Sequence, residues 1–367
     1  MVDADKQIAG FVHGGNVHAW ARESGGELTG ILDYSANINP LGLADSVRKA
    51  ITQSIELLVH YPDVEATMLK AAISNHYHVD VSCITAGNGA VELIYLLAHI
   101  LRPKRVLIPA PTFSEYERAA KAAGAAIEYA YLSAEDDFAI DVDWLCTHLT
   151  GVDMVFVGNP NNPTGTFLTA SQIERLLLTA KQAGVVVVVD ESFMDFIVGD
   201  QDYTCRPLLG QYDNLVIIHS LTKFYAIPGL RLGFALAHPG LTAKLHAAKD
   251  PWNVNLLAQA AGVAALADTE YQTKSREIVN CEKKLLYARL KALKGVKPFV
   301  PSVNYILLDI NASGYAAPQL RQLLAKQSIL IRDCSNYPGL SANYVRVAVK
   351  LEEQNKILLH WLEQVLR

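Results

Sequence analysis

The chain of 367 residues is 51% hydrophobic and 19% charged, and its formal net charge at pH 7 is −5. This balance provides no basic field that would attract nucleic acid or an anionic membrane, and the longest apolar stretches fall short of the roughly 18 residues that a membrane helix needs. The length exceeds a typical single domain, so we expect a large α/β domain accompanied by a smaller one.

Cysteine usage and the first residues bear on the compartment. The five cysteines, an odd number, are scattered without Cys-x-x-Cys spacing: Cys83, Cys146, Cys205, Cys281 and Cys334. This usage fits reduced thiols in a cytosol and argues against a structural zinc site. Residues 1–6 show no basic and apolar leader. We therefore expect a soluble cytoplasmic protein without a metal.

Apolar strands alternate with helical stretches through residues 80–240, which predicts a mainly parallel sheet of the α/β class. The first motif of this region is TAGNGAVE at residues 85–92, before an apolar helical stretch from Leu93 to Leu101. Glycines at a helix start let backbone amides approach a phosphate, and the helix dipole favours the anion. A single glycine-rich turn is weak evidence, so a phosphate site here depends on its neighbours.

Two further strands are followed by side chains suited to a flat ligand. The strand from Arg105 to Pro109 leads to Phe113, which can stack on an aromatic ring or serve as an ordinary core residue. A strand at residues 153–157 runs into the sequence GNPNNPTG at residues 158–165. Such a dense turn aims amide side chains, Asn162 among them, into a cleft, unless it is a plain turn before the helix of residues 169–183.

A run of five valines at residues 185–189 predicts a strand that is buried on both faces and ends at Asp190. Open α/β sheets bind their ligands at this end of their strands. Asp190 therefore predicts a carboxylate in a binding site, although a helix N-cap is the alternative interpretation.

Lys223 stands three residues after Ser220 and eight residues before Arg231. This spacing combines an amine that can capture an aldehyde with a hydroxyl and a guanidinium that can bind a phosphate. Covalent chemistry at the amine requires a lysine that loses its proton near neutral pH, as a desolvated pocket allows. A lysine considered alone is more often a solvated side chain.

The last third of the chain is expected to be helical over residues 240–295 and then to form a smaller α/β unit. The expected elements are strand 303–310, helix 317–326, strand 328–332, strand 344–349 and helix 351–366. We expect an N-terminal segment at residues 1–45 that packs on the small domain, a large domain at 46–270 and a small domain at 271–367.

Taken in order, the glycine-rich turn, the aromatic residue, Asn-Pro-Thr-Gly, the aspartate, Ser-x-x-Lys and the arginine resemble the signature of fold type I pyridoxal phosphate enzymes, the aminotransferase class I/II superfamily. The resemblance covers nearly the whole chain. It implies a pyridoxal 5'-phosphate cofactor, with Lys223 as the Schiff-base lysine and Asp190 as the partner of the ring nitrogen. It further implies Asn162 on the ring oxygen and Phe113 on the ring face. The implied phosphate ligands are Ser220, Arg231 and the backbone of Gly87, Asn88 and Gly89.

The same resemblance extends to the substrate and the subunit structure. Tyr61 is similar to the tyrosine that reaches the phosphate of the partner subunit, which implies a homodimer with shared active sites. Arg346 is similar to the C-terminal arginine that binds the substrate carboxylate, and Arg332 is a second anion ligand. Arginine suits both phosphate and carboxylate, so the sequence leaves open which arginine binds which group. His13 and Asn16 would close over the pocket with Asn37 and Asn39, although His13 alone resembles a solvated loop residue.

Within the superfamily, the chain is similar to histidinol-phosphate aminotransferases, and more so to the L-threonine-O-3-phosphate decarboxylases of cobalamin biosynthesis. Four segments carry this similarity: residues 13–16 (HGGN), 33–42 (DYSANINPLG), 221–231 (LTKFYAIPGLR) and 329–340 (ILIRDCSNYPGL). A departure also fits, because Phe193 stands where histidinol-phosphate aminotransferases usually have a tyrosine.

The resemblance implies decarboxylation of L-threonine O-3-phosphate to (R)-1-amino-2-propanol O-2-phosphate, a small phosphorylated amino acid being the substrate. Decarboxylation of L-serine O-phosphate differs by one methyl group, whose discrimination is worth only about 1–3 kcal/mol, and stays open. Two other functions also stay open. They are a histidinol-phosphate-type aminotransferase and a binding protein that keeps the fold without catalysis.

Overall fold

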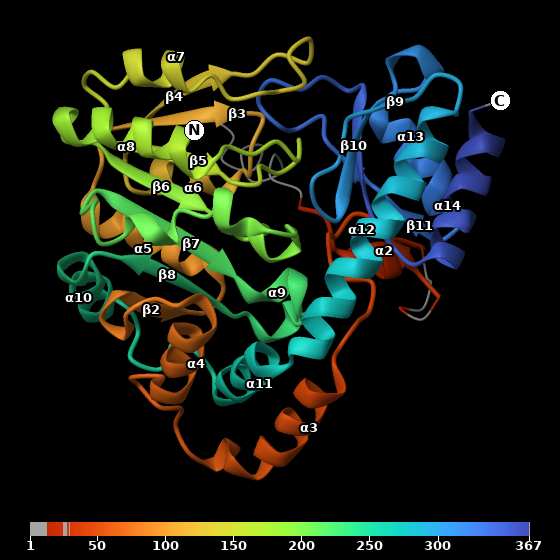
Figure 1. Cartoon of the computed structure of the whole chain (residues 1–367). Helices are drawn as coiled ribbons and strands as arrows, with labels where there is room; N and C mark the ends of the chain where they lie inside the picture. Colours follow the sequence, from red (N-terminus) through yellow and green to blue (C-terminus); the bar gives the residue numbers. More distant parts are fainter. Residues whose placement is uncertain (1–12, 25–27, 29, 367) are drawn as a thin grey trace, which may run out of the picture.

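The computed structural model describes residues 13–24, 28 and 30–366. In these residues the strands form a seven-stranded sheet, a four-stranded sheet and a two-stranded pair. Figure 1 shows the two larger sheets side by side, with the long helix α12 (Thr269–Lys291) rising from beside α11 (Leu256–Ala267) and passing along the small unit. No helix in the described part of the chain is long and apolar enough to cross a membrane.

The seven-stranded sheet has the order β2-β8-β7-β6-β5-β3-β4. Its strands are β2 (Ile84–Gly87), β3 (Arg105–Ala110), β4 (Ala126–Tyr131), β5 (Met154–Gly158), β6 (Val186–Asp190), β7 (Leu215–Ser220) and β8 (Gly233–Ala237). Strand β8 is antiparallel to both neighbours, and the other pairs are parallel. The prediction of a mainly parallel α/β sheet is confirmed.

Helices cover both faces of this sheet, which explains why its strands are apolar almost throughout. One face packs against α5 (Ala90–Leu101), α6 (Glu115–Ala122) and α10 (Pro239–Ala248). The other packs against α4 (Thr67–Tyr77), α7 (Val142–Thr147), α8 (Ala170–Ala183) and α11 (Leu256–Ala267). In β6, Val187 and Val189 join one core and Val188 the other, so the valine run is buried from both sides.

The four-stranded sheet has the order β12-β13-β10-β9 and is antiparallel throughout. It is built from β9 (Lys297–Pro298), β10 (Tyr305–Asp309), β12 (Arg332–Asp333) and β13 (Tyr344–Ala348), and it packs against α12, α13 (Ala317–Ala325) and α14 (Glu352–Val365). The expected strand 328–332 is divided in two. Its first part, β11 (Ile329–Leu330), pairs in parallel with β1 (Leu32–Asp33), and its second part, β12, joins the small sheet.

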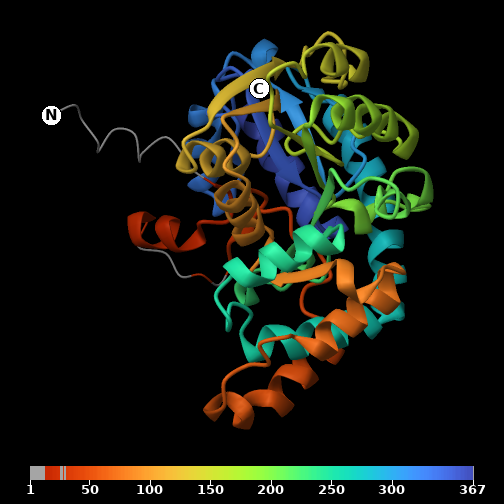
Figure 2. The ribbon, with the colours of Figure 1, turned by 90° about the vertical axis from the view of Figure 1, so that its left-hand side faces the viewer.

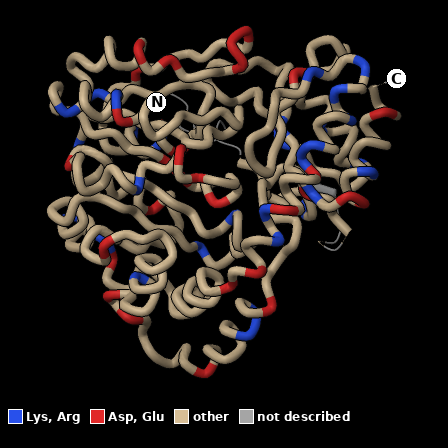
Figure 3. Tube along the Cα trace, viewed as in Figure 1, with Lys and Arg blue, Asp and Glu red and all other residues tan. Residues whose placement is uncertain are grey.

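The N-terminal region contains α2 (Val17–Ser24), β1 and α3 (Asp45–Ser54), and Figure 2 shows α2 at the periphery of the molecule. Tyr34, just after β1, is buried in the core of the small sheet. Short helical turns complete the fold: η1 (Ile55–Val59), η2 (Val81–Cys83), η3 (Met194–Phe196), η4 (Asp200–Asp202), η5 (Arg206–Leu208), α9 (Leu221–Phe224), η6 (Pro228–Leu230) and η7 (Asn311–Ser313). Lys and Arg alternate with Asp and Glu over both units (Figure 3).

Candidate active site

A cavity of about 700 Å³ lies where the carboxyl ends of the large sheet's strands meet the small sheet. Its wall combines the N-terminal loop, the loops that follow β3 and β5, the helix α9 and the strands β12 and β13. Eight of the residues predicted for the site line it: His13, Asn37, Phe113, Asn162, Lys223, Arg231, Arg332 and Arg346. The fold thus brings together side chains that are as far as 333 residues apart in the chain.

Lys223 lines the cavity because α9 begins immediately after β7 and so lies at the end of that strand. Its Nζ donates a hydrogen bond to Ser220 Oγ at 3.0 Å and lies 5.6 Å from the centre of the Phe193 ring. Burial lowers the pKa of Lys223 to about 8; Asp190 acts to raise it, and Arg231 and Arg346 lower it further. The amine therefore meets the requirement that it lose its proton near neutral pH.

Asp190 ends β6 and is held by two donors on one side. Tyr116 Oη donates to its Oδ2 at 2.7 Å, and the Ser192 backbone N–H donates to its Oδ1 at 2.9 Å. Tyr116 is itself fixed by stacking on Phe156, with ring centres 4.8 Å apart and planes at 1°. No α-helix begins at Asp190; the next element is the short turn η3, so the N-cap interpretation fails.

Tyr116 was missing from the sequence-based set of site residues. It follows Phe113 by three positions, and the Tyr116 N–H donates to Phe113 O at 3.3 Å in the turn that leads into α6. The rings of Phe113 and Tyr116 are indeed neighbours, with centres 5.6 Å apart in an edge-to-face arrangement. The spacing was the available signal, but the partner carboxylate comes from a strand 74 residues later.

An anion-binding cradle forms where α5 begins beside Arg231. Gly89 has a φ of +82°, and a Cβ added there would approach Arg231 Nη2 to 2.4 Å, so only glycine leaves room for the guanidinium. Ser220 Oγ lies 2.8 Å from Thr222 Oγ1 and 3.0 Å from Lys223 Nζ. A helix N-terminus, a guanidinium and a hydroxyl are together a suitable set of ligands for a phosphate.

The glycine turn itself differs from the expectation in one respect. The N–H of Asn88 donates to Glu92 Oε2 at 2.6 Å, and the N–H of Gly89 donates to Gly87 O at 2.8 Å. These two amides are therefore already bonded within the chain. The donors left to meet a phosphate are those of the first turn of α5, which a helix cannot bond internally.

Arg332 and Arg346 face each other on neighbouring antiparallel strands, β12 and β13. Both are nearly buried, at 5% and 4% exposure. Arg332 lies over the Tyr337 ring and donates to Asn336, whereas Arg346 donates to Asn162 Oδ1 and to Ser35 O. Like charges directly opposite each other destabilise a sheet, and Arg346 Nε is buried without a hydrogen-bond partner among the described residues. Bound anions would relieve both the repulsion between the two guanidinium groups and the missing partner of Arg346 Nε.

The four residues expected to form a polar lid have different positions. Asn37 lines the cavity, and its buried Oδ1 has no partner among the described residues. Asn39 instead donates to Phe224 O and Ser275 Oγ, both at 2.7 Å, and so holds the backbone behind Lys223. Asn16 caps α2 by accepting from the Ala19 N–H at 3.1 Å. Among the described residues, Asn16 and Asn39 do not line this cavity, but Asn16 lines an adjoining hollow together with His13 and Arg332. A part for these two residues in substrate binding stays a prediction.

Tyr61 lies outside the cavity of its own chain. It is 77% exposed and stacks on Trp252, with ring centres 4.5 Å apart. The neighbouring turn η1 also exposes apolar side chains: Ile55, Leu57, Leu58 and Val59. Together they form an apolar surface on the large unit.

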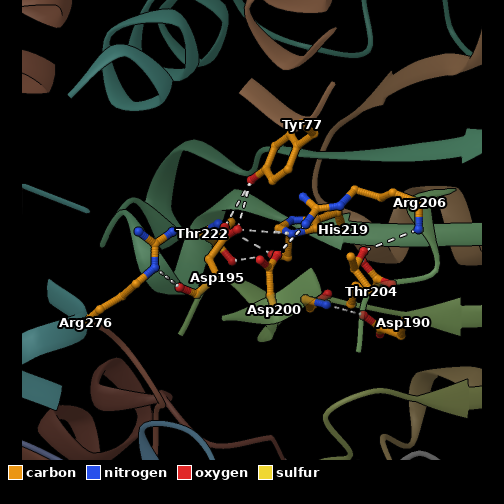
Figure 4. A network of polar contacts seen from close by, with 12 residues as sticks. Tyr77, Asp190, Asp195, Asp200, Thr204, Arg206, His219, Thr222 and Arg276 are labelled. Carbon is orange, nitrogen blue, oxygen red and sulfur yellow. Dashed lines mark hydrogen bonds and ion pairs between the residues drawn. The ribbon is translucent and has the colours of Figure 1, made fainter. Parts of the chain in front are cut away.

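A buried network of polar contacts holds the segment that follows β6 in place (Figure 4). Asp195 accepts from Tyr77 Oη at 3.0 Å, lies 3.5 Å from His219 Nε2 and offers its backbone oxygen to Arg276 of α12. Burial acts to raise the pKa of Asp195, but His219 and its neighbours outweigh this effect and hold it at about 2. The network fixes the turn that carries Asp190 and Phe193, and nothing in the local sequence pattern indicated it.

Known proteins share this fold and much of this sequence. Residues 29–362 match the family model described as aminotransferase class I and II. The threonine-phosphate decarboxylase of Salmonella typhimurium is 36% identical over 356 residues, which cover 96% of each chain. The histidinol-phosphate aminotransferase of Clostridium acetobutylicum has a TM-score of 0.86 and 33% identity, covering 92% of this chain and 99% of that one. The L-threonine-O-3-phosphate decarboxylase of Porphyromonas gingivalis gives 0.81 and 27%, with the same coverage.

Proposed function

The chain belongs to the aminotransferase class I and II family, and on that premise we propose that it decarboxylates L-threonine O-3-phosphate to (R)-1-amino-2-propanol O-2-phosphate, a step of cobalamin biosynthesis. The observation that carries the choice of reaction is the 36% identity to a threonine-phosphate decarboxylase along essentially both full lengths. The facing pair Arg332 and Arg346 supports it, because the substrate carries two anionic groups.

The site fits pyridoxal 5'-phosphate, the cofactor of this family. Lys223 would offer the amine, the Arg231 cradle would hold the phosphate, and Asp190 would pair with the ring nitrogen. Asn162 Oδ1 is bonded to Arg346, so its amide N–H group is what remains for the ring oxygen. Phe113 lines the cavity where a ring face would lie. When bound, the cofactor supplies an electron sink for charge that develops at the substrate Cα.

The protein's own residues select the bond that breaks and supply the proton that follows. Tyr116 and Ser192 hold the Asp190 carboxyl group in place, from where it would pair with the ring nitrogen of the cofactor. Arg332 and Arg346 bind the substrate's two anionic groups and thereby fix the direction of its Cα–carboxylate bond. Lys223 Nζ, whose pKa is near 8, moves the proton that replaces the carboxylate at Cα.

The organisation of the chain follows from the same proposal. We infer a division into residues 1–45, 46–270 and 271–367, because α12 begins at Thr269 beside α11 and passes along the small unit. We also infer a homodimer, since Tyr61 is exposed beside apolar η1 side chains and away from its own cavity. Five free cysteines agree with a cytoplasmic location. A monomeric mass in a fully active preparation would contradict the dimer.

The deciding experiment mixes the cofactor-loaded protein with L-threonine O-3-phosphate in the absence of a keto acid. Continuous carbon dioxide release with a stable visible absorbance is the expected result. One turnover to pyridoxamine phosphate without carbon dioxide would assign a histidinol-phosphate-type aminotransferase instead, which the similarity at a TM-score of 0.86 makes the second candidate. If the purified protein showed no cofactor absorbance, the remaining candidate would be a binding protein that keeps the fold without catalysis. Comparing kcat/KM for L-serine O-phosphate measures the contribution of the methyl group, about 1–3 kcal/mol.

A further inference from the structure

A buried carboxylate stands among the cations that line the cavity. Among the described lining residues, Asp33 and Glu115 are the acidic ones, against the cations Arg118, Lys223, Arg231, Arg332 and Arg346. Asp33 accepts hydrogen bonds from the Ser35 N–H and hydroxyl, so its place in the cavity wall is explained by the turn that it stabilises. Glu115 remains, with a side chain only 6% exposed. A carboxylate there weakens the positive field that an anionic substrate needs, so its presence requires another explanation.

Glu115 joins three elements through hydrogen bonds. Its Oε1 lies 2.6 Å from His13 Nε2 and 2.9 Å from Arg118 Nη1, and its Oε2 accepts from Tyr95 Oη at 3.1 Å. Burial acts to raise the pKa of Glu115, but the bonds from His13 and Arg118 outweigh it and lower the pKa. The carboxylate is thus an anion at neutral pH that orients two donors.

His13 needs such an anchor because its side chain is 43% exposed. The backbone of its loop is fixed elsewhere: the Gly15 N–H donates to Ser35 Oγ at 2.7 Å, and a Cβ at Gly14 would meet Ser35 O at 2.0 Å. These contacts position the chain and leave the imidazole free to rotate. The bond to Glu115 sets its direction, with the ring centre 6.0 Å from that of Phe113.

We propose that Glu115 is a positioning residue that holds His13 and Arg118 in the cavity wall, where they bind the substrate's phosphate together with one of the two facing arginines. The inference rests on the proposed function, since a phosphorylated substrate is what brings an anion to these donors. Arg118 lies one helical turn after Glu115 and lines the same cavity. Donors that are restrained in advance lose less conformational freedom when the ligand binds. Glu115 thereby contributes to affinity without touching the reacting atoms.

The test compares Glu115→Gln with Glu117→Gln in the cofactor-loaded enzyme. Glu117 is a matched control because it lies on the same helix, is similarly shielded at 11% exposure and pairs with Lys121 away from the cavity. With L-threonine O-3-phosphate, E115Q is expected to raise KM about tenfold, corresponding to about 1.4 kcal/mol, and to change kcat less than twofold. E117Q is expected to leave both constants unchanged. Melting temperature and cofactor absorbance show whether each variant is folded.

Coupling to His13 separates positioning from a general effect on the helix. If Glu115 acts through His13 as well as Arg118, E115Q should raise KM less in the H13A background than in the wild-type background. A second readout requires no turnover: in the substrate-free holoenzyme, E115Q should shift the imidazole NMR signals of His13, whereas E117Q should not, because Glu115 contacts the ring and not the backbone.

The outcomes distinguish this inference from the proposed function. An unchanged KM in E115Q, effects of E115Q and H13A that multiply, or an equal rise of KM in E117Q would overturn it. If the wild-type enzyme released no carbon dioxide, the proposed function would fail. The NMR readout would then still decide whether Glu115 holds His13, since unchanged His13 imidazole signals in E115Q refute the contact.

Discussion

Replacing Gly89 by alanine tests whether Arg231 forms the phosphate end of the cofactor site. The new Cβ would come within 2.4 Å of Arg231 Nη2, and the backbone would keep a φ of +82°. The clashing atom is the far end of a flexible side chain, so the guanidinium moves by about 1 Å and the protein still folds. Losing its charge-assisted bond to the phosphate removes about 1.5–3 kcal/mol, which corresponds to a roughly 10-fold to 150-fold weaker Kd for pyridoxal phosphate.

Gly124→Ala is the matched control for this experiment. Gly124 has a φ of +84° and nothing within 4 Å of an added Cβ, so its substitution imposes the backbone strain without the clash. Positive-φ strain of about 1–3 kcal/mol should lower the melting temperature of both variants, and more so for Gly89→Ala, because the ψ of 160° at Gly89 lies in a region open essentially to glycine alone. Titration of cofactor-free protein, followed by visible absorbance, should show weaker binding only for Gly89→Ala. Equal Kd values in the two variants would refute the assignment of Arg231.

Two further predictions concern Lys223 and Asp190. Because burial depresses the pKa of Lys223 to about 8, cofactor incorporation into the free protein requires the neutral amine; its rate should rise about tenfold per pH unit below pH 8 and level off above it. Stopped-flow absorbance measures this, and a rate independent of pH between 6 and 8 would contradict the pKa. Tyr116→Phe removes a donor from the buried Asp190 carboxylate, worth about 1.5–3 kcal/mol, so kcat should fall at least tenfold with little change in KM; an unchanged kcat would show that Tyr116 does not support Asp190.

The large sheet and the centre of the site were predictable because they depend on local chemistry. The valine run before Asp190 is continuous because helices cover both faces of the sheet. Asp190, Ser220 and Lys223 converge because parallel strands end at one edge, whichever helices intervene. The family resemblance, built on the same motifs, is confirmed by the match over residues 29–362.

The supporting residues were not predictable, because their partners come from distant elements. Glu115 and Tyr116 are adjacent on α6, yet one meets the N-terminal loop and the other meets β6. The sequence also does not indicate toward which partner a polar loop side chain points. Asn39 was expected at the substrate, but it donates to Phe224 O and Ser275 Oγ. The apolar residues expected to form one strand at 328–332 follow one another without a break. Such a run does not reveal that its two halves pair with different strands.

That division constrains how such a chain can diverge. Residues 329–330 pair with β1 and residues 332–333 join the small sheet, so Arg332 follows the strand that pairs with β1 by only two residues. An insertion or deletion within residues 329–333 would shift the register of both pairings together. Changes in substrate preference are therefore easier to reach by exchanging side chains on the His13 loop or on α6 than by altering the length of residues 329–333. Sequence variation among enzymes with different substrates should concentrate on the His13 loop and on α6.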